Sequence, residues 1–422
     1  MRRSRGISDG LTAEANQKKS SLQRSLAVSK LTEMAESEVI YLDNNATTRL
    51  DPAVVEEMLP FLTDFYANPS SGYQCAARVR KAIDLARERV AALLGCEPSE
   101  IVFTSCGTES NNAALNAAMQ FEPRGKHIVT SAVEHSAVLR HGQELAKRGC
   151  DVTFLGVDQD GNVDLAELEA AIAPNTAIVS LMWANNETGV LFPVEKAAEI
   201  CRQKRIPFHT DAVQAAGKIP IRLRDTAITY LSISAHKFHG PKGVGALYLN
   251  RTARFRPSMV GGQQEDGRRA GTENVASIVA MGKAAELALQ NLSEEETRVR
   301  TLRDRFEKTI VESLDGTSIN GAGASRLPNT SNLSFDGIES HAALMLLDRQ
   351  RICCSAGSAC KTGSSDGSHV LRAMHAEDRA QRSLRFSFGR FNTESDLDQA
   401  LEIVPKVVTK LRGLSVQTPA AV

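Results

Sequence analysis

Five strand-like runs in the chain are each followed at once by polar residues that could meet in one binding site. Ligands of open parallel sheets gather where the carboxyl ends of the strands meet, so we expect these polar residues to lie together. They include hydroxyls, a carboxylate, an imidazole and a lysine, which could between them hold an organic cofactor that carries a phosphate. The segments are "FTSCGTES" (103–110), "TSAVEHSAVL" (130–139), "WANNETG" (183–189), "FHTDAVQA" (208–215) and "SISAHKFHGPKG" (232–243).

The first segment has the layout of an anion cradle. A strand leads through Ser-Cys-Gly-Thr, with Gly107 and Thr108, into an alanine-rich helix. Backbone N–H groups at a helix start and nearby hydroxyls can hold a phosphate. It is not a Walker A loop, because no Gly-Lys-Ser/Thr follows, and it lacks the dinucleotide pattern G-x-G-x-x-G. The alternative is a simple helix cap by Thr108 or Ser110.

Three other residues each have two possible interpretations, and together with the cradle they favour a cofactor site. Asp211 could cap a helix, or it could hold a protonated ring nitrogen. Lys237 could be an ordinary surface lysine, or an amine with a lowered pKa that forms a Schiff base. His135 could be a core histidine, or an aromatic face stacked on a flat ring. A phosphate cradle, an acid, a lysine and an imidazole plate together describe a site for pyridoxal 5′-phosphate.

An alternation of short strands and helices must position these residues. Short runs rich in β-branched residues, such as "EIVFT" (100–104) and "TYLSIS" (229–234), alternate with helical stretches at 112–119, 137–147 and 194–204. This pattern predicts a mainly parallel sheet covered by helices on both faces. From about Asn291 a charged helix leads to strand-like "NLSFDG" and "SLRFSFG" and to a last helix near 395–411, which predicts a second, α+β domain.

Nine quoted motifs resemble those of one protein family, in order and spacing. They are "YLDNNATT", "ANPSS", "FTSCGTES", "MWANNETG", "FHTDAVQAAGK", "HKFHGPKGVGALYL", "GRRAGTEN", "SAGSAC" and "LRFSFGR", and the resemblance runs from about Val39 to Leu414. The chain is similar to the cysteine desulfurases of the class V aminotransferases, most closely to the NifS-like branch. This resemblance implies the α/β fold of the fold-type I pyridoxal-phosphate transferases, with a mainly parallel seven-stranded sheet and a smaller α+β domain.

The resemblance also implies a role for each candidate residue. Lys237 would bind the cofactor covalently, and Asp211 would pair with the ring nitrogen. His135 would stack on the ring and act in catalysis. The remaining assignments are Gln214 and Asn186 at the ring oxygen, Gly107, Thr108, Ser234 and His236 at the phosphate, Thr272 reaching the phosphate from the partner subunit of a homodimer, and Arg385, with Asn186, on the substrate carboxylate.

The sulfur chemistry is expected at Cys360, in "SAGSACKTGSSDGS". The attacking thiol must reach the cofactor and then carry sulfur to an acceptor, which a Ser/Gly-rich loop allows and a rigid strand does not. By the resemblance, Cys360 is the nucleophile that becomes a persulfide as L-cysteine is converted to L-alanine. We predict no metal site, because Cys353, Cys354 and Cys360 lack a C-x2-C knuckle and a companion histidine. Cys353 and Cys354 are expected to end a strand and to pack as small apolar side chains.

Composition excludes several other classes of protein. The 422 residues carry 50 Lys and Arg against 50 Asp and Glu, so no basic field favours nucleic acid or an anionic membrane. No apolar stretch approaches the roughly 20 residues that span a bilayer. The eight cysteines are mostly scattered, which favours a reducing compartment, and we expect a cytoplasmic protein.

The N-terminal residues have a different composition from the rest. The first 30 contain seven Lys and Arg against two Asp and Glu, with six serines. We expect 1–38 to be a basic, disordered extension; the alternative is a mitochondrial transit peptide, but a clear arginine-rich amphipathic helix is missing. The remaining predicted boundaries are 39–54 for a segment of the small domain, 55–292 for the large cofactor-binding domain and 293–422 for the small domain with the cysteine loop.

Two alternatives to a cysteine desulfurase stay open at this point. Within the same fold, a selenocysteine lyase or another pyridoxal-phosphate lyase would use the same residues. In a different class, a non-catalytic iron–sulfur carrier would use the clustered cysteines as ligands. For a desulfurase, the expected partners are L-cysteine and an iron–sulfur scaffold or other sulfur-acceptor protein, in general cluster assembly or in nitrogenase cluster maturation.

Overall fold

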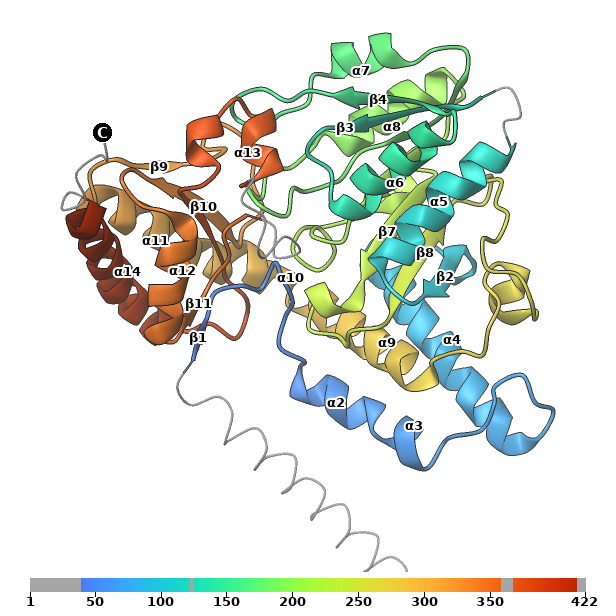
Figure 1. Cartoon of the computed structure of the whole chain (residues 1–422). Coiled ribbons are helices and arrows are strands. Elements are labelled where there is room, and N and C mark those ends of the chain that lie inside the picture. Colours follow the sequence, from blue (N-terminus) through green and yellow to red (C-terminus); the bar gives the residue numbers. More distant parts are fainter. Residues whose placement is uncertain (1–38, 122–124, 358–366, 416–422) are drawn as a thin grey trace, which may run out of the picture.

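The computed structural model describes residues 39–121, 125–357 and 367–415. The predicted extension 1–38 and Cys360 both lie outside the described residues. Within the described part, the chain builds one large sheet with its helices and, beside it, a smaller group of strands and helices (Figure 1). The boundaries of the two predicted domains stay a prediction.

The large sheet has seven strands in the order β2-β8-β7-β6-β5-β3-β4. Its five strands from β7 to β4 pair in parallel, whereas β8 runs antiparallel to both of its neighbours. The prediction of a mainly parallel, seven-stranded α/β sheet is therefore confirmed. The strands are β2 (Ile101–Thr104), β3 (His127–Ser131), β4 (Asp151–Leu155), β5 (Thr176–Ser180), β6 (Phe208–Asp211), β7 (Tyr230–Ser234) and β8 (Gly245–Leu249).

Helices cover the large sheet, and local sequence signals mark the ends of two of them. Asp164 caps one of them by accepting a hydrogen bond from the Ala166 N–H, and Gly95 ends another with a φ of 63°, a conformation that glycine adopts without strain. α4 and α9 lie together along one side of the sheet, with α5 and α6 on the other (Figure 1). The helices are α2 (Pro52–Met58), α3 (Pro60–Thr63), α4 (Gln74–Leu94), α5 (Gly107–Phe121), α6 (Ser136–Lys147), α7 (Leu165–Ala171), α8 (Val194–Gln203) and α9 (Val275–Gln290).

The smaller group contains a three-stranded antiparallel sheet in the order β12-β10-β9 and a two-stranded parallel pair, β1 with β11. Through this pair, the first described residues join the C-terminal part of the chain. The strands are β1 (Ile40–Tyr41), β9 (Thr317–Ile319), β10 (Thr330–Phe335), β11 (Ile352–Cys353) and β12 (Ser383–Ser387). The helices are α10 (Leu292–Glu294), α11 (Arg300–Ser313), α12 (Ser340–Arg349), α13 (His369–Ala373) and α14 (Glu394–Ser415).

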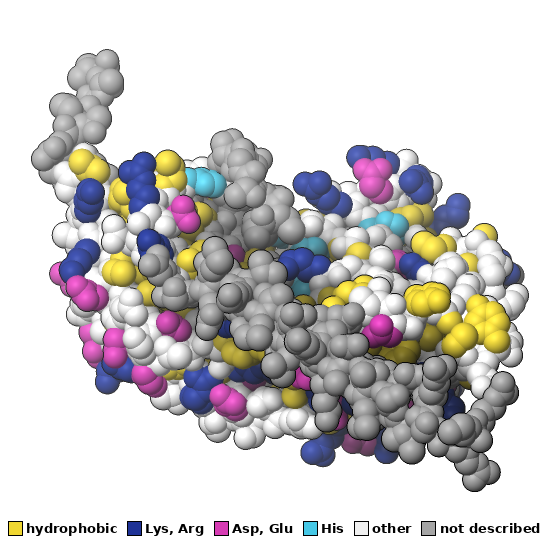
Figure 2. Space-filling view, turned by 90° about the horizontal axis from the view of Figure 1, so that it is seen from below, with side chains coloured by type: hydrophobic (Ala, Val, Ile, Leu, Met, Phe, Trp, Pro, Cys, Tyr) yellow, Lys and Arg dark blue, Asp and Glu magenta, His cyan; other side chains and the backbone are white. Residues whose placement is uncertain are grey.

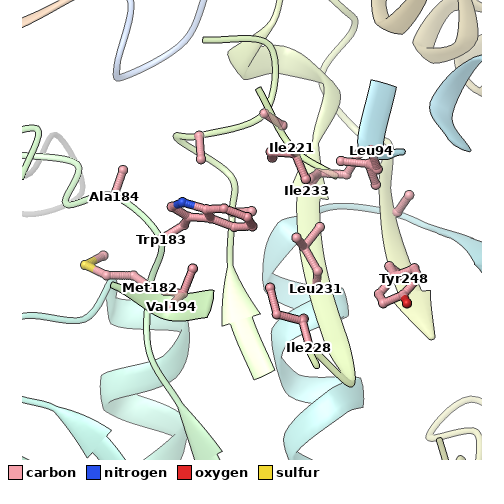
Figure 3. Packing of buried hydrophobic residues seen from close by; sticks show 14 of the residues in the cluster. Leu94, Met182, Trp183, Ala184, Val194, Ile221, Ile228, Leu231, Ile233 and Tyr248 are labelled. Carbon is pink, nitrogen blue, oxygen red and sulfur yellow. The ribbon is translucent and has the colours of Figure 1, made fainter. Parts of the chain in front are cut away.

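Separate apolar cores lie under the two groups of strands. The larger core includes buried residues of α4, β5, β6, β7 and α9, and the smaller one joins Leu42 to α11, α12 and α14. Trp183, the single tryptophan, belongs to the larger core and points toward Leu231 and Ile233 of β7 (Figure 3). Burial of apolar area is the main stabilising contribution to such a fold, about 25 cal/mol for each Å².

Two helical segments have local irregularities. The run that opens at Pro52 is divided into α2 and α3 at Pro60, because proline cannot donate the N–H that a continuous helix needs. The charged helix after Asn291 contains a π-helical turn at Glu295–Val299 before α11 continues it. An extra residue in a turn of this kind shifts the helix face by part of a turn.

Two global features agree with the composition. No helix among the described residues is long and apolar enough to cross a membrane. On the face shown in Figure 2, lysine and arginine side chains are interspersed with aspartate and glutamate, as the formal net charge of zero predicts.

His209 makes a testable contribution to stability. It is fully buried in β6 between Ser180 Oγ, at 2.8 Å, and Ser232 Oγ, at 3.0 Å, and burial lowers its pKa to about 3. The unfolded chain therefore binds one proton more between that value and the unperturbed pKa of about 6.5, so stability is lost as the pH falls through this window.

We expect a His209→Asn variant to lose less stability on acidification than the parent protein. The slope of the unfolding free energy between pH 6.5 and pH 5 should fall by about 1.4 kcal/mol per pH unit. Denaturant titrations at several pH values measure this slope. His341→Asn, at an exposed position, is the matched control. Equal slopes for the parent and His209→Asn would contradict the assignment.

Candidate active site

A cavity of about 260 Å³ lies at the carboxyl ends of the large sheet's strands. It brings together ten of the residues that the sequence singled out, from six separate segments of the chain. These residues are Gly107, Thr108, His135, Asn186, Asp211, Gln214, Ser234, His236, Lys237 and Arg385.

Lys237 lies in a 3₁₀ turn, Ala235–Lys237 (η3), directly after β7. Its Nζ donates hydrogen bonds to the backbone carbonyls of Asn45, at 2.5 Å, and Ala46, at 2.7 Å. These two contacts hold the amine at the cavity wall, where it can reach a bound ligand.

Asp211 ends β6 and is buried at the floor of the cavity. Its Oδ2 accepts a 2.6 Å hydrogen bond from Asn111 Nδ2 of α5, and its Oδ1 accepts one from the backbone N–H of Val213. These donors fix the orientation of the carboxylate without neutralising it. The described ion pairs give Asp211 no arginine or lysine partner, so its charge can stabilise a cationic ring nitrogen.

His135 caps the start of α6 through its Nδ1, which accepts a hydrogen bond from the Ala137 N–H at 3.2 Å. Because Nδ1 accepts, a neutral ring carries its hydrogen on Nε2. The preceding residue, Glu134, is fully buried and accepts hydrogen bonds from Ser131 Oγ and the Met182 N–H. Burial raises the pKa of Glu134 to about 8, so a neutral carboxyl group supports the turn that carries His135.

The anion end of the cavity is formed by the start of α5 and the end of β7. A Cβ atom on Gly107 would lie 2.7 Å from Val213 Cγ2, so only glycine lets the helix start approach this closely. Ser234 and His236 come from β7 and the turn after it. Burial, followed by the charge of Lys237, lowers the pKa of His236 to about 3, so this imidazole is neutral and acts as a polar neighbour.

Arg385 of β12 enters the cavity from the smaller group of strands. Its guanidinium donates to the backbone carbonyl of Asn186, at 2.8 Å, and to Asp43 Oδ1, at 2.7 Å. The residue is almost completely buried, and its Nε has no hydrogen-bond partner among the described residues. A buried donor without a partner costs about 1–3 kcal/mol, and an anionic group of a ligand could accept this hydrogen bond.

These residues fit pyridoxal 5′-phosphate. Gly107 leaves an open cradle at a helix start, Asp211 offers an unneutralised carboxylate, and Lys237 offers an amine in the same cavity. The unpartnered Arg385 Nε adds a place for the carboxylate of an amino acid. The donor set therefore matches a phosphate, a pyridinium, an aldehyde and an α-amino acid.

Two predicted site residues are not brought into this cavity. Thr272 is exposed on the segment before α9, and it is not among the residues that line the cavity. The neighbouring Arg269 pairs with Glu109 of α5 at 2.9 Å, which connects this segment to the first turn of α5. Cys360 lies outside the described residues.

Cys353 and Cys354 occupy the positions that the sequence predicts. Cys353 ends β11, and Cys354 packs against the smaller apolar core. Burial raises the pKa of both thiols, which makes them poor nucleophiles. Among the described residues, no group of three or more His, Cys, Asp or Glu side chains could hold a metal ion.

The roles predicted from the sequence did not include Asn45, which connects several residues of this site. Its carbonyl accepts hydrogen bonds from both Lys237 and Gln214, and its Nδ2 donates to Thr330 Oγ1 at 2.8 Å. The only signal in the sequence was the polar run "DNNATT" after a short strand. That strand, β1, is not part of the large sheet. The expectation that ligands bind at the carboxyl ends of parallel strands therefore did not point to Asn45.

Comparisons with known proteins show the family of this chain. Residues 40–400 match the aminotransferase class-V family. A cysteine desulfurase from Nostoc sp. is 50% identical over 378 residues, covering 89% of this chain and 94% of that protein. The cysteine desulfurase NifS of Azotobacter vinelandii is 48% identical with the same coverage.

Solved structures give the same result. The structure of a NifS-like protein superposes with a TM-score of 0.83 at 39% identity and covers 88% of this chain and all of the other. A structure described as SspA in complex with cysteine has a TM-score of 0.74 at 36% identity, covering 84% of this chain and 99% of the other. The chain therefore belongs to the aminotransferase class-V family and, within it, to the NifS-like cysteine desulfurases.

Proposed function

We propose that this enzyme uses pyridoxal 5′-phosphate to convert L-cysteine to L-alanine and transfers the sulfur to Cys360 as a persulfide. The observation that carries the proposal is that the Lys237 amine, the Asp211 carboxylate and the Arg385 guanidinium all line one cavity. An amine, an acid and a carboxylate-binding group at one place suit an amino-acid substrate and a pyridoxal cofactor.

The residues of the cavity would bind different parts of the cofactor according to their charge. The start of α5, Ser234 and His236 would hold the phosphate, and Asp211 would hold the ring nitrogen in its protonated form. The cofactor would supply an electron sink for the bonds at the substrate's α and β carbons. Lys237 would hold or release a proton at its Nζ, and His135 would do so at its Nε2, the nitrogen that the helix cap leaves available.

The sulfur transfer balances without an external oxidant. The bond between the substrate's β carbon and sulfur breaks, and a bond between that sulfur and Cys360 Sγ forms. The β carbon gains an electron pair and a proton to become the methyl group of alanine, while the sulfur is oxidised to the sulfane state. Cys360 must be ionised to attack, since the thiolate is the nucleophile.

A product assay tests this function. The purified protein is loaded with pyridoxal 5′-phosphate and incubated with L-cysteine and a thiol reductant, and alanine and sulfide are measured together. Equal amounts of the two products support a desulfurase. L-selenocysteine in a parallel reaction separates a selenocysteine lyase, which would prefer it strongly. A protein that binds iron and forms no alanine would instead be an iron–sulfur carrier.

Arg385→Lys should weaken the use of L-cysteine mainly through KM. Lysine keeps the positive charge but loses the planar fork that binds a carboxylate with two hydrogen bonds. We expect KM to rise about 10- to 100-fold, in line with a lost charged hydrogen bond. Steady-state kinetics measure the change. Arg305→Lys, in an exposed pair with Glu394 and Asp398, is the control. An unchanged KM would remove Arg385 from substrate binding.

The assembly is proposed to be a homodimer with shared sites, in which Thr272 reaches the phosphate of the partner subunit's cofactor. The exposed position of Thr272 and the Arg269–Glu109 pair beside it support this proposal. A mixture of Lys237→Ala and Thr272→Val chains tests it, because one of the two heterodimer sites would then carry neither defect. If no mixture regains activity, the sites are not shared.

The destination of the sulfur and the cell compartment are also proposals. An iron–sulfur scaffold or other acceptor protein would take sulfur from the Cys360 persulfide, for general cluster assembly or nitrogenase cluster maturation. The free, scattered cysteines favour a reducing compartment such as the cytoplasm. A mitochondrial site is the alternative if the basic residues at the N-terminus act as a transit peptide.

A further inference from the structure

A second lysine lies beside the cofactor cavity and has no part in the chemistry proposed so far. Lys218 follows β6 by seven residues and is only 5% exposed. Its partners within hydrogen-bond distance are both neutral amides, Gln214 Oε1 at 2.8 Å and Asn45 Oδ1 at 3.4 Å. Among the described residues, no ion pair within 4.0 Å involves Lys218, and Glu295 acts on it through a longer-range charge interaction. Burying an ammonium is costly unless it is hydrogen-bonded, so the two amide contacts are important for stabilising Lys218.

The contact with Gln214 determines which end of that amide faces the cavity. The Lys218 ammonium has only donors, so the atom that it contacts in Gln214 must be the oxygen. The other end of the amide, Nε2, donates to the Asn45 carbonyl at 2.9 Å. Lys237 Nζ donates to the same carbonyl, so the Gln214 N–H group and the Lys237 amine converge on one oxygen at the cavity wall.

We propose that Lys218 is a positioning residue that holds the Gln214 amide with its N–H group toward the cofactor cavity, where the anionic ring oxygen of pyridoxal 5′-phosphate would bind. The proposal rests on the proposed cofactor. A reversed amide would place its oxygen against both the Asn45 carbonyl and the ring oxygen, two acceptors that repel it. Lys218 and the Asn45 carbonyl together allow only the other orientation.

The surroundings of Lys218 support a role as a hydrogen-bond donor. Behind it, Lys218, Lys237 and Glu295 line a second cavity of only about 10 Å³, room for roughly one water molecule. Burial, and then the charge of Lys237, lowers the pKa of Lys218, while Glu295 opposes this shift. A neutral amine can also accept a hydrogen bond, so Lys218 selects the amide orientation as a charged ammonium, while the Asn45 carbonyl favours the same orientation in either protonation state.

The fluorescence of Trp183 can be used to follow cofactor binding. Trp183 is the single tryptophan, and its neighbours Met182 and Ala184 line the cofactor cavity (Figure 3). Quenching of its fluorescence follows the binding of pyridoxal 5′-phosphate to the apoprotein. The position of the visible absorption band of the bound cofactor is a second readout, which depends on the contact to the ring oxygen and not on overall stability.

Lys218→Met tests the inference, because it keeps an unbranched side chain of nearly the same length and removes the donor. We expect about tenfold weaker binding of pyridoxal 5′-phosphate and a displaced visible band, the effect of one buried polar contact. In a Gln214→Ala background the same change should have little further effect, since Lys218 acts through Gln214. Glu295→Gln, in the same small cavity but without a contact to Gln214, should leave both readouts unchanged.

Failure of the inference about Lys218 can be distinguished from failure of the proposed function. An unchanged affinity and band in Lys218→Met, or an equal loss in the Gln214→Ala background, would overturn the role of Lys218. If Lys218→Met does not fold, Gln214→Glu is the alternative variant. It keeps an oxygen acceptor for Lys218 but removes the N–H group of the Gln214 side chain. This variant should bind the cofactor more weakly and show a displaced visible band. Unchanged readouts there would also overturn the role. Failure of the parent protein to bind pyridoxal 5′-phosphate would instead refute the proposed function.

Discussion

Lys237→Ala should abolish turnover of L-cysteine, with a fall in kcat of about 10³-fold or more, and should remove the visible band of the covalently bound cofactor. The lost amine is both the attachment point of the cofactor and a proton carrier within the cavity. Absorbance spectra and kinetics with L-cysteine measure the two effects. Because Asp211 and the start of α5 remain, the variant should still bind pyridoxal 5′-phosphate without a covalent bond.

Lys242→Ala is the matched control for this prediction. Lys242 is exposed and lies five residues after Lys237 on the same segment. It should keep full activity and the visible band. The loss of two hydrogen bonds, to the Asn45 and Ala46 carbonyls, also predicts some loosening of this segment in Lys237→Ala. An undiminished visible band in Lys237→Ala would refute the assignment of the lysine.

Cys360→Ser should form no persulfide and should lose turnover by a similarly large factor of about 10³ or more, because a hydroxyl at neutral pH is a far poorer nucleophile than a thiolate. Substrate should still bind, since Lys237, Asp211 and Arg385 are unchanged. Mass spectrometry after a single turnover locates the transferred sulfur. The change in the cofactor's absorption on addition of L-cysteine reports substrate binding separately.

The two neighbouring cysteines provide the controls. Cys353→Ser and Cys354→Ala should remain active, because burial raises the pKa of both thiols and β11 holds Cys353 in place. Cys354→Ala should cost about 1 kcal/mol or slightly more of stability, since its side chain packs against the smaller core. Sulfur found on Cys353 or Cys354, with Cys360→Ser still turning over, would refute the role of Cys360.

Much of the cofactor cavity could be predicted because its residues follow strands. Asp211 ends β6, Lys237 follows β7, and Gly107 begins the helix after β2. Alternating strands and helices are visible in sequence as local periodicity, and parallel strands bring their carboxyl ends to one edge. The strand assignments from β2 to β7 were therefore accessible without any knowledge of long-range contacts.

The class of fold, the family and the chemical type of each candidate group can be inferred from the sequence, and so can the sheet edge at which these groups are expected. Which of the groups touch one another depends on the tertiary structure. Asp43 pairs with Arg385 across 342 residues of sequence, and the Asn45 carbonyl joins Gln214 to Lys237. Only packing of the smaller group of strands against the large sheet creates these contacts, because local periodicity carries no information about which distant segments meet. For the same reason, the burial of Lys218 behind Gln214 could be found only in the folded chain.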